Sequence, residues 1–217
     1  MAVLSALRRP TLAGSGRAAL LLFFAATTAL VVVESLPYYT FADDIPFFQE
    51  KWDVYRTLTW RIAFYVHVSG GLLCILSALP QFSKTLLRRA PRVHKALGWT
   101  YVVSVLGLTA PAGLYMAIFA KGGMPGRIGF ILLGVALVYT TWRGLQYVLA
   151  RDFRGHVDWM IRSYAMAASA LTFRVFYVLL FLAGVEGEYV IAIWLSLVVN
   201  LLAAELIVWR RHRGVSK

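Results

Sequence analysis

Histidine side chains stand at the start of two apolar segments, and their type and spacing indicate what chemistry they could perform. His94 and His156 each follow a basic linker, and a tyrosine follows each, Tyr101 and Tyr164. Two neutral imidazoles on neighbouring helices can ligate a haem iron from both faces, or supply half of a zinc or copper site. Histidines at helix starts can instead cap the backbone or contact lipid phosphates. The pattern leaves both interpretations open, a shared ligand and two separate capping residues.

Two further ionisable side chains, His67 and Arg174, lie deeper within apolar segments. Charged groups are costly inside a bilayer, so each requires a partner or a function. Because arginine keeps its charge, Arg174 must extend to the interface, pair with Glu34, or hold an anionic group such as a propionate or a lipid phosphate. His67 can equally be a packing residue or a ligand. We therefore treat His67 and Arg174 as a second candidate site, for a ligand or an anion.

The composition is that of a membrane protein. Hydrophobic residues make up 60% of the 217 residues, and the mean hydropathy is +0.69, whereas soluble domains are about 45–50% apolar. The formal net charge is +12, but the charges cluster at the ends of apolar runs. They therefore indicate topology and contacts with anionic lipid head groups, and no nucleic acid is expected. A single cysteine, Cys74, excludes a disulfide within the chain.

Six apolar runs are long enough to cross a bilayer, which requires roughly 20 residues per helix. The sequence thus predicts an all-α integral membrane bundle of six transmembrane helices over residues 18–209. A basic segment, 1–17, precedes this bundle, and a basic tail, 210–217, follows it. The predicted helices span residues 18–37, 58–79, 97–120, 128–149, 159–183 and 188–209.

The beginning of the chain allows two interpretations. The apolar run at 18–37 follows several arginines, as in a signal peptide, but no small-x-small cleavage site follows it. We expect a retained helix, with a cleaved signal peptide as the alternative. The aromatic loop at 38–57 predicts a short interfacial helix that begins at Asp44 or Pro46.

The loops alternate in charge and so predict an orientation. Basic residues concentrate before the first helix, after the second and fourth helices, and in the tail, while acidic residues dominate the other loops. Cytoplasmic loops carry an excess of Lys and Arg. We therefore expect a multi-pass protein of the inner membrane with both termini in the cytoplasm. Its expected partners are anionic lipid head groups at the cytoplasmic face, and a homo-oligomer or a redox partner stays open.

Helical spacing and this topology sort the polar residues into two layers. Gln81, Tyr101 and Arg162 are expected to surround a ligand held by His94 and His156. Pro111 should kink its helix, Asn200 should join helices, and His212 should be a solvated tail residue. The predicted inner layer contains Gln81, His94, Arg143, His156, Arg162 and Glu205, and the predicted outer layer contains Glu34, Arg61, His67 and Arg174.

Four segments of the chain resemble a known family. They are FYVHVSGGLLCILSALPQFS (64–83), PRVHKALGWTYVVSV (91–105), GLYMAIFAKGG (113–123) and HVDWMIRSYAMAASALTFRV (156–175). The chain resembles the predicted bacterial membrane proteins grouped as domain of unknown function 2306. The resemblance implies a multi-helix membrane protein and no activity. The positions of this sequence that match the family's characteristic residues are His67, Gln81, His94, Gly98, Tyr101, His156, Trp159, Met160, Arg162, Ser163 and Arg174.

The element HKALGWTY (94–101) is also similar to the histidine–leucine–glycine helix start of transmembrane b-type cytochromes. The chain departs from the two-haem pattern, because two haems need four histidines and only three lie at membrane depth. One haem b between His94 and His156 fits the pattern, and a transition metal on the same two residues is the alternative.

Three functional hypotheses follow. The first is a histidine-based redox protein that binds haem or a metal, and the second is a small transporter or a lipid- or anion-binding protein. The third is a structural or assembly subunit without a ligand. The chain contains no GxSxG, HExxH, P-loop or GxGxxG signature, so the sequence assigns no reaction.

Overall fold

The computed structural model describes residues 12–213, with side chains from residue 22 onward. Every regular element in the described part is a helix. The chain divides into two compact units, Met1–Phe41 and Ala42–Lys217, which are described separately. The basic N-terminal residues 1–11 and the last tail residues, 214–217, lie outside the described part.

The described part of the N-terminal unit consists of a long helix and a short one. The α-helix α1, Leu12–Ser35, is followed by the short 3-10 helix η1, Leu36–Thr40. Alanine and leucine dominate the sequence of α1 and favour helix formation. The α-helix ends just before Pro37, as expected, because the residue before a proline disfavours the α conformation. The Ser35 hydroxyl donates to the carbonyl oxygen of Val31 at 2.7 Å, which satisfies its hydrogen bonding within the apolar helix.

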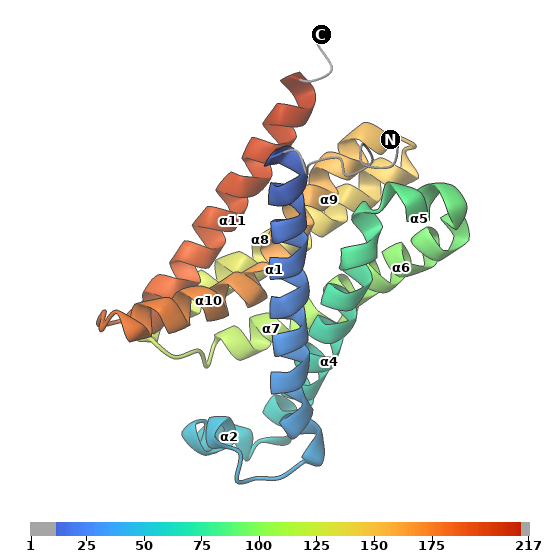
Figure 1. Ribbon diagram of the computed structural model, residues 1–217. Coiled ribbons are helices and arrows are strands. Elements are labelled where there is room, and N and C mark those ends of the chain that lie inside the picture. The colour runs from blue at the N-terminus through green and yellow to red at the C-terminus, as the bar shows by residue number, and fades with distance from the viewer. Residues whose placement is uncertain (1–11, 214–217) are drawn as a thin grey trace, which may run out of the picture. The chain divides into compact units, whose positions relative to one another are not determined.

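The larger unit contains all the remaining helices, and Figure 1 shows their arrangement. Together with the N-terminal unit it provides six helices that are long and apolar enough to cross a membrane, which confirms the predicted all-α, six-helix fold class. The elements are α2 Pro46–Glu50, α3 Trp52–Tyr55, α4 Leu58–Ala78, the 3-10 helix η2 Leu79–Phe82, α5 Lys84–Arg89, α6 Pro91–Val103, the π-helix η3 Ser104–Thr109, α7 Ala110–Ala117, α8 Gly123–Leu149, α9 Phe153–Ala167, α10 Ser169–Leu182 and α11 Glu188–Arg213.

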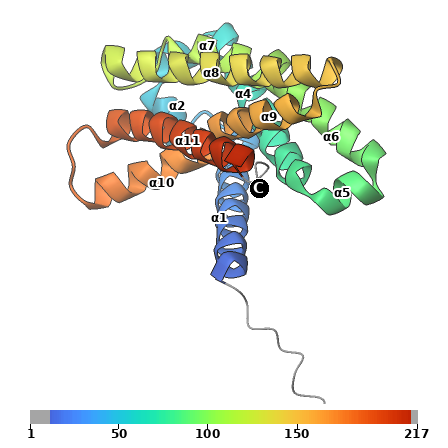
Figure 2. The ribbon, with the colours of Figure 1, turned by 90° about the horizontal axis from the view of Figure 1, so that it is seen from above.

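Small residues allow these helices to pack closely. α8 lies beside α9, and α11 packs against both, while α4 packs against η3, α6 and α7 (Figure 2). A Cβ atom at Gly144 of α8 would lie 2.6 Å from the Met160 sulfur of α9, so glycine lets the two helices approach without displacing the Met160 side chain. The buried core cluster contains Cys74, Ala78, Tyr101, Val105, Ala110, Leu137, Met166 and Ala167.

The helices that carry the two histidines begin earlier than the sequence predicted. α6 begins at Pro91 rather than residue 97, because proline fits the first position of a helix. α9 begins at Phe153 rather than residue 159, because the Asp152 carboxylate caps it and accepts a hydrogen bond from the Gly155 amide at 2.9 Å. Both histidines therefore lie in the first turn of their helices.

Two of the long helices are interrupted near their middles. The π-helix η3 separates α6 from α7 and lies just before Pro111. Proline has no amide hydrogen and so cannot donate the backbone hydrogen bond of an α-helix. The predicted distortion at Pro111 thus takes the form of a π-segment on its N-terminal side. The fifth span, which was predicted as one helix over 159–183, divides at Ala168 into α9 and α10.

Positive charge gathers at one end of the larger unit. Figure 1 places α5, the start of α6, the start of α9 and the end of α11 at this end, and α2 at the other. We call it the basic end. Its basic residues include Lys84, Arg88, Arg89, Arg92, Lys95, Arg151, Arg154, Arg210, Arg211 and Arg213. The arrangement matches the loops that were predicted to share a side, whereas their cytoplasmic location stays a prediction.

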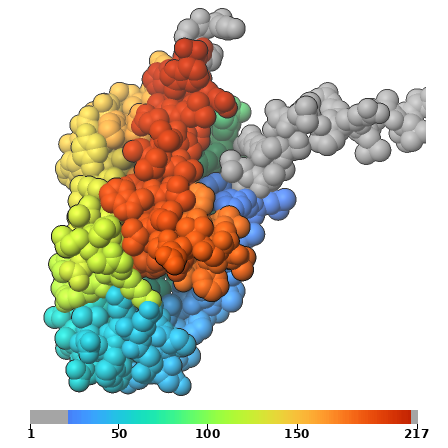
Figure 3. Space-filling model, turned by 90° about the vertical axis from the view of Figure 1, so that its left-hand side faces the viewer, coloured from blue at the N-terminus to red at the C-terminus, as the bar shows by residue number. Residues whose placement is uncertain are grey.

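The C-terminal helix continues into the predicted tail. α11 extends to Arg213, whereas the sequence predicted a helix end at 209. The space-filling view in Figure 3 shows α11 in red at the surface, with α10 in orange beside it. Side chains such as Leu195, Val198 and Leu202 are exposed along α11, as expected for a helix that faces lipid.

The opposite end is closed by aromatic side chains. α2 begins at Pro46, one of the two predicted starts, and Phe48 stacks on Tyr55 with ring centroids 4.2 Å apart. The Tyr55 hydroxyl donates to the Asp43 carboxylate at 2.7 Å. Burial raises the pKa of Tyr55 to about 12, and this hydrogen bond adds to the shift. Burial also lowers the pKa of Lys51, whose ammonium group donates to the Phe119 carbonyl oxygen.

Candidate functional site

A cavity of about 940 Å³ lies at the basic end, with walls formed by α4, η2, α5, α6, α8, α9 and α11. We call it the histidine cavity, because His94 and His156 both line it. Its volume lies within the range of ligand-binding pockets, about 300–1,000 Å³. Gln81 and Tyr101, which were also predicted as site residues, contribute to the same wall. The structure thus brings four of the five predicted cofactor-binding residues together.

His156 is held by a hydrogen bond to a neighbouring helix. Its Nδ1 atom lies 2.9 Å from the carbonyl oxygen of Gly144 in α8. A carbonyl oxygen can only accept, so Nδ1 carries the proton and the Nε2 lone pair is available. Histidines that bind metals usually have this arrangement, in which one ring nitrogen donates to a carbonyl and the other faces the metal.

The imidazole of His94 lacks a hydrogen bond like the one that holds His156. Its Nδ1 atom is buried and has no hydrogen-bond partner in the described structure, while its backbone carbonyl accepts from Gln81 Nε2 at 3.0 Å. His94 also interacts electrostatically with His156. A buried polar atom without a partner is costly, so Nδ1 is an unsatisfied polar group in a residue that lines the cavity.

Neither histidine caps the helix on which it lies. The residue before α6 is Ala90, and the helix has no side-chain cap, whereas α9 is capped by Asp152. The capping interpretation of the two histidines is therefore wrong. The sequence could not exclude it, because the identity of the cap depends on where each helix begins.

A chain of buried hydroxyl groups begins at the cavity wall. The Tyr101 hydroxyl lies 2.7 Å from Ser163 Oγ, which lies 2.7 Å from Thr141 Oγ1. Thr141 Oγ1 also donates to the Leu137 carbonyl oxygen at 2.7 Å. The chain joins α6, α9 and α8. Thr141 carries no signal of this contact in the sequence, because a threonine in an apolar helix usually bonds only to its own backbone.

Arg162, the fifth predicted cofactor-binding residue, does not line the cavity. Its guanidinium donates to both carboxylate oxygens of Glu205, at 2.6 and 2.8 Å, which joins α9 to α11. The guanidinium carbon also lies 4.8 Å from the centroid of the Trp159 ring. Glu205 was expected to pair with Arg143 or Arg162, and in the structure it pairs with Arg162. The position of the ion pair indicates a packing role.

His67 and Arg174, the second candidate site, lie outside the histidine cavity. His67 Nδ1 lies 2.8 Å from the carbonyl oxygen of Thr109 in η3, and a Cβ atom at Gly113 would lie 2.7 Å from the imidazole. The Arg174 guanidinium donates to the Ala170 carbonyl at 2.7 Å and interacts electrostatically with His67. The predicted pair is thus linked electrostatically. Glu34, one of the three alternatives considered for Arg174, belongs to the other unit.

Several residues of the histidine cavity were missed by sequence analysis. Lys84, Lys95 and Arg211 line it, although the sequence suggested only that they mark the topology. Its apolar wall includes Trp99 and Tyr164. A lysine near a helix end looks the same in a sequence whether it faces water or a cavity, so no sequence signal distinguishes these residues.

Asn200 and His212 each contact another helix. Asn200 joins helices as predicted, because its amide donates to Ser169 and Thr172 of α10, each at 2.9 Å. His212 is exposed, as predicted for a solvated residue, but its Nε2 atom also lies 2.7 Å from the Asp158 carboxylate, a contact that the sequence did not predict.

Metal coordination by side chains alone is limited. Within residues 12–213, the structure contains no cluster of three or more His, Cys, Asp or Glu residues that could hold a metal ion. Structural zinc sites use four such ligands, and catalytic zinc sites use three. A metal ion on His94 and His156 would therefore need most of its ligands from groups other than these side chains.

A family model for predicted membrane proteins, DUF2306, matches residues 64–208, about two-thirds of the 217 residues. The chain belongs to this family. Comparisons with curated proteins and with solved structures find no match. The DUF2306 match covers both histidines of the cavity and the His67–Arg174 pair, and it ends before Arg211.

Proposed function

We propose that this DUF2306 protein is a redox protein of the inner membrane that binds haem b in the histidine cavity, with His94 and His156 as the iron ligands. The observation that carries the proposal is that both histidines line one cavity of about 940 Å³. They come from different helices, α6 and α9, and interact electrostatically.

Haem fits this site better than a bare metal ion does. A porphyrin supplies four nitrogen ligands itself, so two imidazoles complete the coordination of its iron. A zinc or copper ion held by only two histidines would lack the further protein ligands that such sites use. The described residues offer no third ligand in a cluster. The transition-metal alternative is therefore the weaker one.

The remaining lining of the cavity matches an amphipathic, acidic ligand. Trp99, Tyr164 and neighbouring leucines provide an apolar wall, and Lys84, Lys95 and Arg211 provide positive charge. Cations of this kind pair with the propionates of a haem. When bound, haem supplies one-electron chemistry. The roles of the protein are to hold His156 through Gly144, to position His94 through Gln81, and to keep the cavity largely apolar.

The proposal is tested by the absorption spectrum of the protein purified from cells supplied with haem. The wild-type protein should show a Soret band with about one haem per chain, and His94→Ala and His156→Ala should each weaken haem binding strongly. His67→Ala is the matched control, because His67 lies outside the cavity, and it should keep the band. A folded wild-type protein without colour would contradict the proposal and favour a structural or assembly role.

A second candidate function, anion binding or transport, is favoured by the electrostatic interaction between His67 and Arg174. The two residues interact electrostatically, and His67 bonds to the π-helix η3 beside Pro111. Interrupted helices near the membrane midplane often form transport sites, and intramembrane arginines often hold anions.

This second function predicts that Arg174→Gln loses uptake or binding of an organic anion in proteoliposomes while the helix content stays normal. Arg61→Gln is the matched control, because Arg61 packs over the Tyr55 ring, 5.1 Å from its centroid. Equal anion binding by wild type and Arg174→Gln would contradict it.

A further inference from the structure

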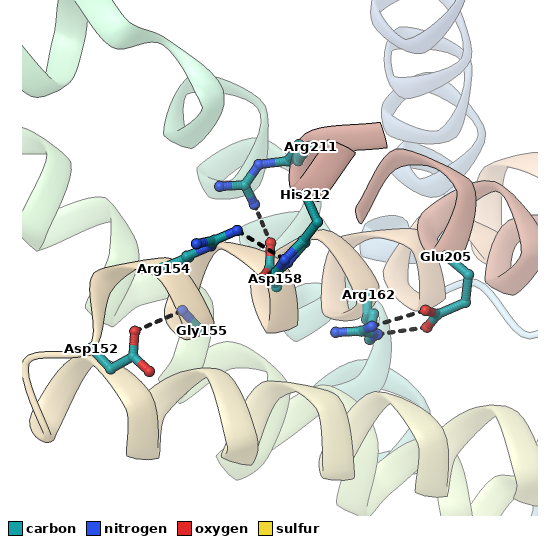
Figure 4. A network of polar contacts seen from close by, with 8 residues as sticks. All are labelled: Asp152, Arg154, Gly155, Asp158, Arg162, Glu205, Arg211 and His212. Atoms are coloured by element: carbon teal, nitrogen blue, oxygen red, sulfur yellow. Dashed lines mark hydrogen bonds and ion pairs between the residues drawn. The ribbon is translucent and has the colours of Figure 1, made fainter. Parts of the chain in front are cut away.

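A second, smaller pocket lies at the basic end, between the start of α9 and the end of α11. Its volume is about 270 Å³, and four residues line it, Arg154, Asp158, Arg211 and His212. Figure 4 shows that Arg154 and Asp158 come from α9, while Arg211 and His212 come from α11. We call it the arginine pocket. It shares only Arg211 with the histidine cavity.

Asp158 organises the side chains of the arginine pocket. One of its carboxylate oxygens accepts a hydrogen bond from Arg211, and the other lies 2.7 Å from His212 Nε2 (Figure 4). The Asp158 side chain is only 10% exposed, so this carboxylate is fixed and largely removed from water. It therefore holds Arg211 and His212 in defined positions, and its charge is used within the protein.

Arg154 completes the pocket with a charge that no carboxylate in the described structure neutralises. Its Nη2 atom lies 3.0 Å from His212 Nδ1. Because arginine donates, Nδ1 must accept, and the imidazole is neutral with its proton on Nε2. The pocket thus contains one carboxylate and two guanidinium groups, which leaves it with a net positive charge. A guanidinium has five donors and binds phosphate oxygens in pairs.

The neighbourhood of the arginine pocket is that of a membrane interface. The fifth span begins at Phe153 and the sixth ends at Arg213, so the pocket lies at the ends of two membrane-spanning helices. Phe153 is 64% exposed, and Trp209 is 49% exposed, beside the charged residues. Exposed aromatic residues next to arginines are typical of the level at which lipid head groups lie.

We propose that the arginine pocket binds the phosphate group of a membrane phospholipid, with Arg154 and Arg211 as donors and Asp158 as a positioning residue. The small pocket accepts a phosphate, and the exposed apolar residues beside it contact the acyl chains. This inference goes beyond haem binding, because Arg154 and Asp158 do not line the histidine cavity.

The test is native mass spectrometry of the full-length protein, in its wild-type and Arg154→Gln forms, with phosphatidylglycerol or phosphatidylcholine. Arg154→Gln should retain phosphatidylglycerol about tenfold less well, because it loses a charge-assisted pair of hydrogen bonds. Arg92→Gln is the matched control, because Arg92 is an exposed arginine at the same end that lines neither pocket. Arg154→Lys keeps the charge but loses the paired donors, so it should fall between wild type and Arg154→Gln.

The source of the phosphate is tested by competition with soluble glycerol phosphate. We expect glycerol phosphate to leave the retained lipid in place, because it lacks acyl chains. Displacement of the lipid at millimolar glycerol phosphate would support phosphate recognition but assign it to a soluble ester. Equal retention by Arg154→Gln and Arg92→Gln would overturn the proposal. The haem spectrum of Arg154→Gln reports separately on the histidine cavity.

Discussion

At the scale of single residues, the cavity depends on polar groups whose partners lie on other helices. His156 bonds to the backbone of α8, and Tyr101 bonds to Ser163 of α9. The sequence predicted His94, His156, Gln81 and Tyr101 as neighbours, because helical spacing places each on a polar face. It could not predict the Gly144 carbonyl as a partner, since every residue carries a carbonyl group.

The hydroxyl chain predicts an asymmetry between two substitutions. Ser163→Ala removes the partner of the buried Tyr101 hydroxyl and should lower the free energy of unfolding by about 1–3 kcal/mol. Tyr101→Phe removes a hydroxyl and leaves Ser163 bonded to Thr141, so its cost should be smaller. Denaturant unfolding in detergent, followed by circular dichroism, measures both. Equal losses of unfolding free energy in the two variants would show that the hydroxyl chain does not hold the Tyr101 hydroxyl.

Tyr55 predicts how stability depends on high pH. Its pKa is raised from 10.0 to about 12 in the folded protein, so the folded state holds the phenolic proton more tightly than the unfolded state. The stability that follows is fully present below pH 10 and is lost as the pH rises through about 12. Thermal unfolding should show that the melting temperature falls less between pH 9 and pH 11.5 for Tyr55→Phe than for wild type. A larger loss in the variant would contradict the assignment.

At the scale of elements, helix boundaries and interruptions decide where the site residues lie. Pro111 signalled the distortion of the third span, because its ring and missing amide hydrogen disturb a helix. The break at Ala168 had no comparable signal, because alanine is the best helix former and no proline or glycine lies beside it. Polar contacts between α10 and α11, such as those of Asn200, accompany the break, and they depend on the folded arrangement.

The close approach of α4 to the π-helix η3 predicts opposite effects at adjacent glycines. A Cβ atom at Gly70 would lie 2.7 Å from Leu108 Cβ and from Thr109 Oγ1, so Gly70→Ala should destabilise the protein by about 1–3 kcal/mol. A Cβ atom at Gly71 meets nothing within 4 Å, so Gly71→Ala should be neutral or should stabilise by up to about 1 kcal/mol. Unfolding midpoints of the two variants in one detergent give the comparison. The reverse order would show that α4 and η3 are not in close contact.

At the scale of the whole molecule, the six-helix architecture could be predicted from hydropathy alone. A bilayer requires long apolar helices with satisfied backbones, and few alternatives meet this requirement. The walls of the cavity could not be predicted in the same way, because they combine residues from η2, α5, α6, α8, α9 and α11. Lys84 and Arg211 thus had an evident topological role in the sequence but no evident role at the site.

The predicted orientation can be tested with single cysteines. A cysteine at Arg88, in α5 at the basic end, should react with a membrane-impermeant maleimide only after the cytoplasmic face is opened. A cysteine in place of Asp53, in α3 at the opposite end, should react in intact cells whose outer membrane has been made permeable. The native Cys74 is 2% exposed and should not contribute. Labelling of the position 88 cysteine from outside would reverse the orientation.

The central claim is that His94 and His156 bind one ligand together, and electron paramagnetic resonance of the ferric haem-loaded protein tests it most directly. Two imidazole ligands hold a ferric haem iron in the low-spin state, so the wild type should give a low-spin signal. His94→Ala and His156→Ala should each shift the signal to high spin, and His67→Ala should leave it unchanged. A wild-type signal that survives in both cavity variants, or that is high-spin from the start, would contradict the claim.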